Sequence, residues 1–152
     1  MDKSEALQTL QCAREVGVVY DVKKTSIQLL NKVVHHFESV GKNVMTLGFI
    51  AEKKLDDHTP TIKEEYFCLN DLTFWKLPKK AVVSNFIGKK FDFLINLDQL
   101  GSNELQAIST YSNAKIRIGK HFEEYPFSQD FMIKSHAESS DELFSEIKKY
   151  IK

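Results

Sequence analysis

Residues 90–119 constrain the fold more than any other part of the chain. A short apolar run at residues 91–98 ends in an acid, a polar turn then opens a segment of helical period, and residues 115–119 form a β-branched run. A strand, a crossover helix and a second strand in this order are the repeating unit of a parallel α/β sheet. The first run is almost continuously apolar, which is typical of a strand covered on both faces.

A second unit of the same kind lies before it. A valine-rich run at residues 15–22 predicts the first strand, Thr25 or Ser26 caps a helix that ends near Val40, and residues 43–51 predict the second strand. The crossover between these strands should be right-handed. Together the two units predict a three-layer, mainly parallel open α/β sheet of five or six strands. This sheet should be Rossmann-like, with the strand order 3-2-1-4-5.

The remaining segments complete a single α/β domain of residues 1–152. Residues 1–14 predict an N-terminal helix or arm. Residues 66–69 and 71–76 predict an edge strand, in which Trp75 covers one edge of the core. Pro78 opens a further helix. Near the C-terminus we expect a short strand at residues 131–136 and a helix capped by Ser139 or Ser140.

The charge balance narrows the classes of partner. Lys and Arg number 21, as do Asp and Glu, so the net charge is zero. This disfavours nucleic-acid binding and indicates no membrane association, because both depend on an excess of basic residues. Neutrality also lowers repulsion between copies, which favours a homodimer. Cys12 and Cys68 lack Cys-x-x-Cys spacing, and no secretory signal or membrane-spanning run is visible, so we expect a cytoplasmic location.

Several segments together resemble a known but uncharacterised family. They are Tyr20-Asp21 after the valine-rich run, residues 44–49 (Val-Met-Thr-Leu-Gly-Phe), Phe74-Trp75, residues 91–97, residues 112–119 and the closing helix at residues 142–150. The pattern is similar to a domain of unknown function found in small α/β proteins of Bacteroidota. The resemblance extends from about residue 14 to the C-terminus. It implies the fold and brings no established activity with it.

A weaker resemblance concerns the segment from Asp92 to Gly119. A strand of the type Asp-Phe-Leu-Ile-Asn-Leu, a helix and a strand Ala-Lys-Ile-Arg-Ile-Gly are similar to the N-terminal half of the bacterial heptosyltransferases. This resemblance implies a Rossmann-like topology. Those enzymes bind their nucleotide-sugar donor mainly through a second Rossmann-like domain, for which 152 residues leave no room.

Two loops that follow predicted neighbouring strands form the candidate ligand site. In open α/β sheets, ligands bind beyond the carboxyl ends of the strands, where the strand order reverses. Backbone N–H groups at two helix starts, together with a lysine, could hold an anion there. The candidate residues are Asp21, Lys23, Lys24, Thr25 and Ser26 after the first strand, and Asp98, Gln99, Ser102 and Asn103 after the central strand.

A simpler interpretation of these residues is structural: the hydroxyls and Asn103 cap helices, the lysines are solvated and the acids end strands. We prefer it, because the chain has no Gly-x-Gly-x-x-Gly and no Walker motif. His35 and His36 are adjacent, and their side chains point about 100° apart on a helix. The other histidines are scattered, so no metal site is predicted. No nucleophile motif is present either, and we predict no catalytic residue and no cofactor.

A local basic patch flanks the helix that Pro78 opens. With Phe74 and Trp75 beside it, the patch allows a phosphate-bearing partner such as RNA. The simpler interpretation is a solvated helix surface whose lysine stems cover apolar edges. The patch consists of Lys76, Lys79, Lys80, Lys89 and Lys90.

Nucleic-acid binding through this patch is one of three functional hypotheses, and two others rank before it. The preferred one is a non-enzymatic binding or interaction module whose partner is an unknown small molecule or protein. The alternative is an enzyme, or a degenerate enzyme, that binds a phosphorylated or nucleotide-linked small molecule at the carboxyl ends of the parallel strands. The alternative requires an open polar crevice in which Lys23 or Lys24 approaches Ser102.

Overall fold

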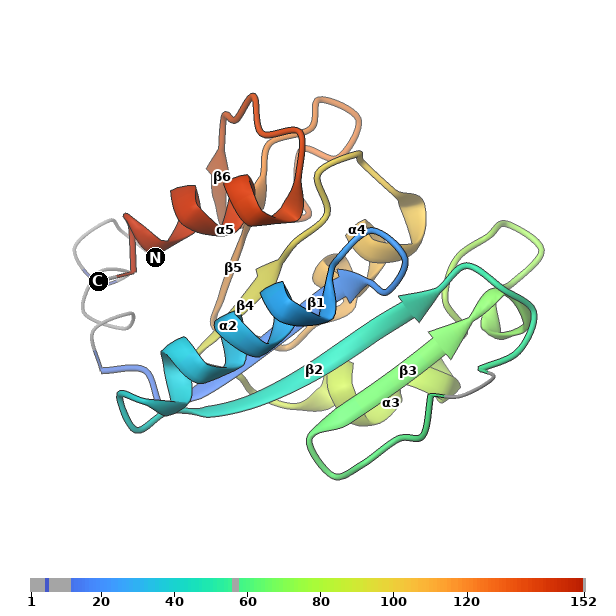
Figure 1. Cartoon of the computed structure of the whole chain (residues 1–152). Coiled ribbons are helices and arrows are strands. Elements are labelled where there is room, and N and C mark those ends of the chain that lie inside the picture. Colours follow the sequence, from blue (N-terminus) through green and yellow to red (C-terminus); the bar gives the residue numbers. More distant parts are fainter. Residues whose placement is uncertain (1–4, 6–11, 56–57, 152) are drawn as a thin grey trace.

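A single parallel sheet organises the computed structural model, which describes residue 5 and residues 12–55 and 58–151. Within this part of the chain, six strands pair in the order β3-β2-β1-β4-β5-β6 (Figure 1). The predicted Rossmann-like order is therefore confirmed, and β6 extends it by one strand. The strands are β1 (Glu15–Asp21), β2 (Asn43–Ile50), β3 (Glu64–Cys68), β4 (Phe93–Asn96), β5 (Ile116–Lys120) and β6 (Phe131–Ile133).

The centre of the sheet is the joint between β1 and β4. These two strands run parallel, and Val16 lies opposite Phe93 while Val18 lies opposite Ile95. The chain builds outward from β1 through β2 to β3 and outward from β4 through β5 to β6. The strand order therefore reverses between β1 and β4, which makes this joint the topological switch point of the sheet.

Helices cover both faces of the sheet. On one face α2 (Ile27–Glu38) packs beside α5 (Ser140–Lys148), and on the other α3 (Lys80–Gly88) packs beside α4 (Asn103–Tyr111). α2 and α5 begin as the sequence predicts: the side chains of Ser26 and Ser139 accept hydrogen bonds from backbone N–H groups in their first turns. α3 begins two residues after Pro78, at Lys80, because Pro78 pairs with Leu72 in an antiparallel bridge. In the described part of the chain, no helix has the length and apolarity needed to cross a membrane.

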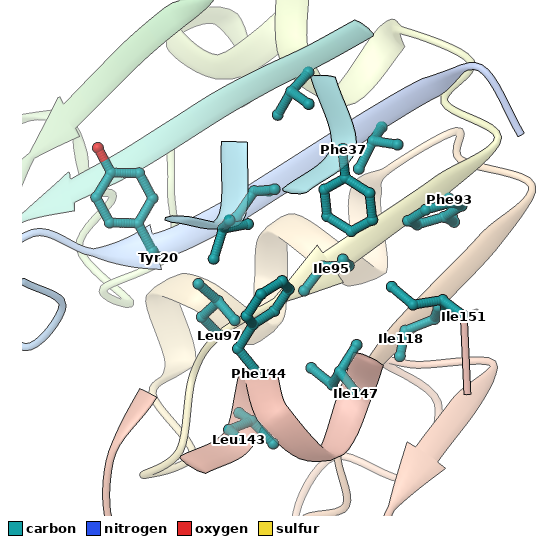
Figure 2. Packing of buried hydrophobic residues seen from close by; sticks show 14 of the residues in the cluster. Tyr20, Phe37, Phe93, Ile95, Leu97, Ile118, Leu143, Phe144, Ile147 and Ile151 are labelled. Atoms are coloured by element: carbon teal, nitrogen blue, oxygen red, sulfur yellow. The ribbon is translucent and has the colours of Figure 1, made fainter. Parts of the chain in front are cut away.

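Two apolar cores lie on the two faces. Under α2 and α5, the ring of Phe37 packs edge-to-face against Phe93 and Phe144, with centroids 5.6 Å and 6.1 Å away (Figure 2). Under α3 and α4, Phe86 packs on Phe91 with centroids 5.0 Å apart. Rings buried on both faces explain why the central strand is almost continuously apolar in sequence.

The segment before α3 differs from the prediction. Residues 71–76 form no strand, because the Asp71 carboxylate accepts a hydrogen bond from the Cys68 N–H and turns the chain through the short 3₁₀ helix η1 (Leu69–Asp71). Trp75 does not cover the core: its side chain is 76% exposed. Most of the predicted N-terminal helix or arm, namely residues 1–4 and 6–11, lies outside the described residues.

Candidate functional site

The Asp98 carboxylate, just beyond β4, is bound from within the chain. Its Oδ1 accepts hydrogen bonds from the N–H groups of Leu100 and Gly101 at 3.0 and 3.1 Å. Its Oδ2 accepts from the N–H of Ser102 at 2.7 Å and from Nε2 of Gln106 at 2.8 Å. The residue is 5% exposed. Four donors match the number of hydrogen bonds that a carboxylate readily accepts, so its acceptor capacity is used.

The Asp21 carboxylate at the end of β1 is arranged in a similar way. Its Oδ1 accepts hydrogen bonds from the N–H groups of Lys23 and Lys24 at 2.9 and 3.2 Å, which forms an Asx turn. The Lys23 ammonium pairs with the Glu52 carboxylate at 3.1 Å and lies 3.4 Å from the Ala51 carbonyl. Lys23 is thereby directed toward the end of β2. The side chain of Lys24 is exposed.

The first residue of α5 joins the two candidate loops. The Ser140 hydroxyl donates to Oε1 of Gln99 at 2.8 Å, and its oxygen lies 3.2 Å from the Thr25 hydroxyl. Ser140 and Thr25 are both buried. The loops after β1 and β4 therefore do come together, as predicted, but the start of α5 lies between them.

The other predicted site residues act locally. Ser26 and Ser102 accept hydrogen bonds from backbone N–H groups as the caps of α2 and α4. The Ser102 hydroxyl also donates to Glu104 at 2.9 Å. The Asn103 side-chain oxygen accepts a hydrogen bond from the Tyr125 hydroxyl. Lys23 and Ser102, which the enzyme hypothesis requires to approach each other, thus bind different residues.

A buried polar network beneath α4 is the feature that sequence reasoning missed. The Asn96 amide donates to the Ser109 hydroxyl at 2.9 Å, and the Gln106 oxygen accepts from the Ser128 hydroxyl at 2.7 Å. The Gln129 amide donates to the same Ser109 hydroxyl at 3.0 Å. These bonds tie β4 and α4 to the loop at residues 121–130. One signal was visible: Asn96 interrupts an otherwise apolar strand.

Gly119 in β5 makes room for this network. A Cβ atom at this position would lie 2.9 Å from Cδ of Gln129, closer than real side chains allow. The Oε1 atom of Gln129 is buried and has no hydrogen-bond partner among the described residues. The network is therefore packed tightly against the sheet.

The environment of Tyr125 shows where negative charge gathers. Burial raises the pKa of its phenol, and the carboxylates of Asp98, Glu104 and Glu124 raise it further. The phenol therefore stays protonated at neutral pH and can donate to Asn103.

The five patch lysines fall into two groups along α3. Lys76, Lys79 and Lys80 lie at its start, where the Lys80 ammonium stands 4.6 Å from the ring centre of Tyr111. Lys89 and Lys90 follow its end. Lys89 lies 3.7 Å from the Glu15 carboxylate. Across the described residues, no three His, Cys, Asp or Glu side chains gather in a way that could hold a metal ion.

These observations define a Rossmann-like α/β protein whose switch point is occupied by its own side chains. A family model matches residues 2–152, and the chain belongs to that family, which is described as a family of unknown function (DUF6913). The predicted resemblance to an uncharacterised family is thereby confirmed. No curated protein matches the chain.

Among solved structures, the comparison found the E. coli heptosyltransferase WaaC with ADP. It is similar to this chain at 14% sequence identity and a TM-score of 0.41. The match covers 87% of this chain and 46% of the other, so this chain spans about half of that protein's length.

Proposed function

We propose that the chain is a non-enzymatic interaction protein and that its switch point is a structural joint. The observation that carries this proposal is the bonding of Asp98. The backbone N–H groups of the loop after β4 are the donors that an anionic ligand would need. Three of them already donate to the Asp98 carboxylate.

A phosphate placed in this loop would meet two costs. It would have to replace the bonds between the backbone and Asp98, and it would lie next to a buried carboxylate of the same charge sign. Lys23, in the loop after β1, was expected to supply a positive charge for the anion, but its ammonium pairs with the Glu52 carboxylate. These contacts favour the interaction module over the enzyme that acts on phosphorylated substrates.

A thermal-shift screen tests this proposal with ADP, UDP-glucose, glucose 6-phosphate and inorganic phosphate. A ligand present at 100 times its Kd would stabilise the protein by about 2.7 kcal/mol, which raises Tm by about 5 to 10 °C for a chain of this size. We expect no such rise for any of the four compounds.

A rise of this size that disappears in Lys23→Ala with Lys24→Ala would overturn the proposal. The matched control is Lys32→Ala with Lys134→Ala, which removes two exposed lysines away from the switch point. Turnover of any of these compounds would also overturn it.

The same proposal includes a cytoplasmic location and a bacterial origin. Cys12 and Cys68 both carry free thiols, which supports a reducing cytoplasm. The resemblance to Bacteroidota proteins supports a bacterial origin. Labelling of unfolded, freshly extracted protein with a thiol reagent should find both cysteines reactive; one intramolecular disulfide would contradict the cytoplasmic assignment.

A further inference from the structure

A structured hairpin precedes α3 and projects beyond the end of β3 (Figure 1). The Thr73 N–H donates to the Leu77 carbonyl at 2.7 Å, and the Lys76 N–H donates to the Thr73 carbonyl at 2.9 Å. Leu72 and Pro78 form an antiparallel bridge at its base. Lys76 has a φ of 59°, a left-handed conformation that non-glycine residues adopt at a cost. We call residues 72–79 the basic hairpin.

The tip of the basic hairpin presents aromatic side chains to solvent. Phe74 is 90% exposed and Trp75 is 76% exposed, and their rings meet edge-to-face at 5.3 Å. The side chains of Lys76 and Lys79 beside them are exposed as well. Exposed Trp and Phe on an ordered turn are the residue types that form the centres of protein interfaces.

A second loop also exposes an aromatic side chain and carries the opposite charge. Residues 121–130, which we call the acidic loop, expose Phe127 at 83% and also expose Glu123 and Glu124. The buried network and the hydroxyl of Tyr125 hold this loop against α4. The acidic loop therefore complements the basic hairpin: each exposes aromatic surface, and two acids in the loop correspond to two lysines in the hairpin.

The positions of the two loops are suited to a two-fold arrangement. The basic hairpin follows the carboxyl end of β3 at one edge of the sheet, and the acidic loop leaves the carboxyl end of β5 toward β6 at the other edge (Figure 1). Both lead along the face that carries α3 and α4. A two-fold axis along the sheet normal reverses the strand direction and exchanges the edges. It therefore brings the hairpin of each copy to the loop of the other.

We propose that two copies of this chain associate through their carboxyl ends, with the basic hairpin of each copy bound to the acidic loop of the other. This inference rests on the proposed function, because an interaction surface replaces a ligand crevice at this end of the sheet. The arrangement is isologous and closes after two copies. Phe74 and Trp75 would pack against Phe127, and the two lysines would face Glu123 and Glu124.

The charge pattern favours a second copy over nucleic acid as the partner. A polyanion would be attracted by the basic hairpin but repelled by Glu104, Glu123 and Glu124, on the same face of the molecule. A second copy uses both signs of charge. It also buries three exposed aromatic side chains at each of two contacts, and each such side chain carries about 150–250 Å² of surface.

Light scattering and sedimentation over a wide concentration range test this proposal on the full chain. The wild type should approach twice the 17.5 kDa chain mass. Phe74→Ala with Trp75→Ala should weaken association at least about tenfold. Lys76→Glu with Lys79→Glu, or Glu123→Lys with Glu124→Lys, should each weaken it by about the same factor because like charges then face each other.

Mixing the two charge-reversed variants provides the strictest readout. In Lys76→Glu with Lys79→Glu, both the hairpin and the loop are negatively charged. In Glu123→Lys with Glu124→Lys, both are positively charged. The mixture should therefore form heterodimers, while each variant alone remains monomeric. The control, Lys32→Glu with Lys90→Glu, makes the same charge change elsewhere and should dimerise like the wild type. Circular dichroism confirms that all variants are folded.

A wild type that stays monomeric, or a dimer that none of these variants weakens, would overturn the inference. A mass that rises beyond two copies would overturn the two-fold arrangement. Retention of the wild type on single-stranded RNA, lost in Lys76→Glu with Lys79→Glu, together with a monomeric mass, would favour nucleic acid instead. These experiments measure mass and RNA retention, whereas the proposed function is tested by turnover and ligand-induced stabilisation. The two claims can therefore fail independently.

Discussion

At the scale of single residues, Asp92 is the clearest case of a side chain that joins segments far apart in sequence. Its Oδ2 accepts hydrogen bonds from the N–H groups of Arg14 and Glu15 at 2.8 and 2.9 Å. Its Oδ1 lies 3.2 Å from the Lys115 ammonium. Burial alone would raise the pKa of Asp92, but these donors outweigh it and hold the pKa below the usual value. One carboxylate thus links the starts of β1, β4 and β5.

The lowered pKa of Asp92 predicts a dependence of stability on pH. The folded state favours the ionised form, so the stabilisation is complete above the unfolded pKa of about 4 and is lost as pH falls through the lower folded pKa. We expect Asp92→Asn to lower the free energy of unfolding by about 1–2 kcal/mol at pH 7. Urea denaturation of both proteins at pH 7 and pH 3 measures the difference, which should shrink at pH 3.

The control for Asp92 is Glu138→Gln, which removes an exposed carboxylate and should change the stability at neither pH. A difference between wild type and Asp92→Asn that grew as pH fell would contradict the assigned role of Asp92.

At the residue scale, the sequence predicted the helix caps but did not predict hydrogen-bond partners that are distant in sequence. Ser26, Ser102 and Ser139 were identifiable because a cap depends on a few neighbouring residues. The pairing of Ser140 with Gln99 spans 41 residues and leaves no local signature. For the same reason, the sequence predicted that the two candidate loops would meet but could not show what lies between them.

At the scale of elements, α4 and the acidic loop behave as one unit. Gln106 accepts from Ser128 on one side and donates to Asp98 on the other, so a single amide serves the loop and the end of β4. The loop sequence is irregular and predicted no structure. Its order comes from α4, whose polar residues a hydrophobic pattern treats as solvent-facing.

We expect Gln106→Leu to lower the free energy of unfolding by about 1–3 kcal/mol, because it removes one buried donor to Asp98 and the buried acceptor at 2.7 Å from the Ser128 hydroxyl. Urea denaturation measures this loss. Gln28→Leu makes the same substitution on the exposed side of α2 and should stay within about 0.5 kcal/mol of the wild type. Equal effects of the two substitutions would show that the network adds nothing to stability.

The basic hairpin shows the limit of pattern reasoning for elements. Phe74 and Trp75 are the residue types that normally enter a core, which is why Trp75 was expected to cover one. The turn at Asp71 and the left-handed Lys76 direct the chain away from the sheet. Neither constraint is readable from hydrophobicity. The resulting exposed aromatic pair is the basis of the proposed contact between copies.

At the scale of the whole molecule, the fold consists of two halves that meet between β1 and β4. The strand order was predictable, since apolar runs, short turns and right-handed crossovers allow few topologies. The halves are held together by strand pairing and by α5, whose first residue contacts the loops after both strands. The polar groups at the switch point therefore serve the joint between the halves.

The measurement that tests this account most directly is the stability of Asp98→Asn, determined by urea denaturation. The substitution keeps the shape of the side chain but places an amide where the carboxylate accepts from Ser102 and Gln106. If Asp98 holds the joint, the free energy of unfolding should fall by about 3 kcal/mol. Asp141→Asn, an exposed acid in the first turn of α5, should lose less than about 1 kcal/mol. An Asp98→Asn protein as stable as the wild type, or more stable, would contradict the account, because residues kept for a ligand are commonly replaced without loss of stability.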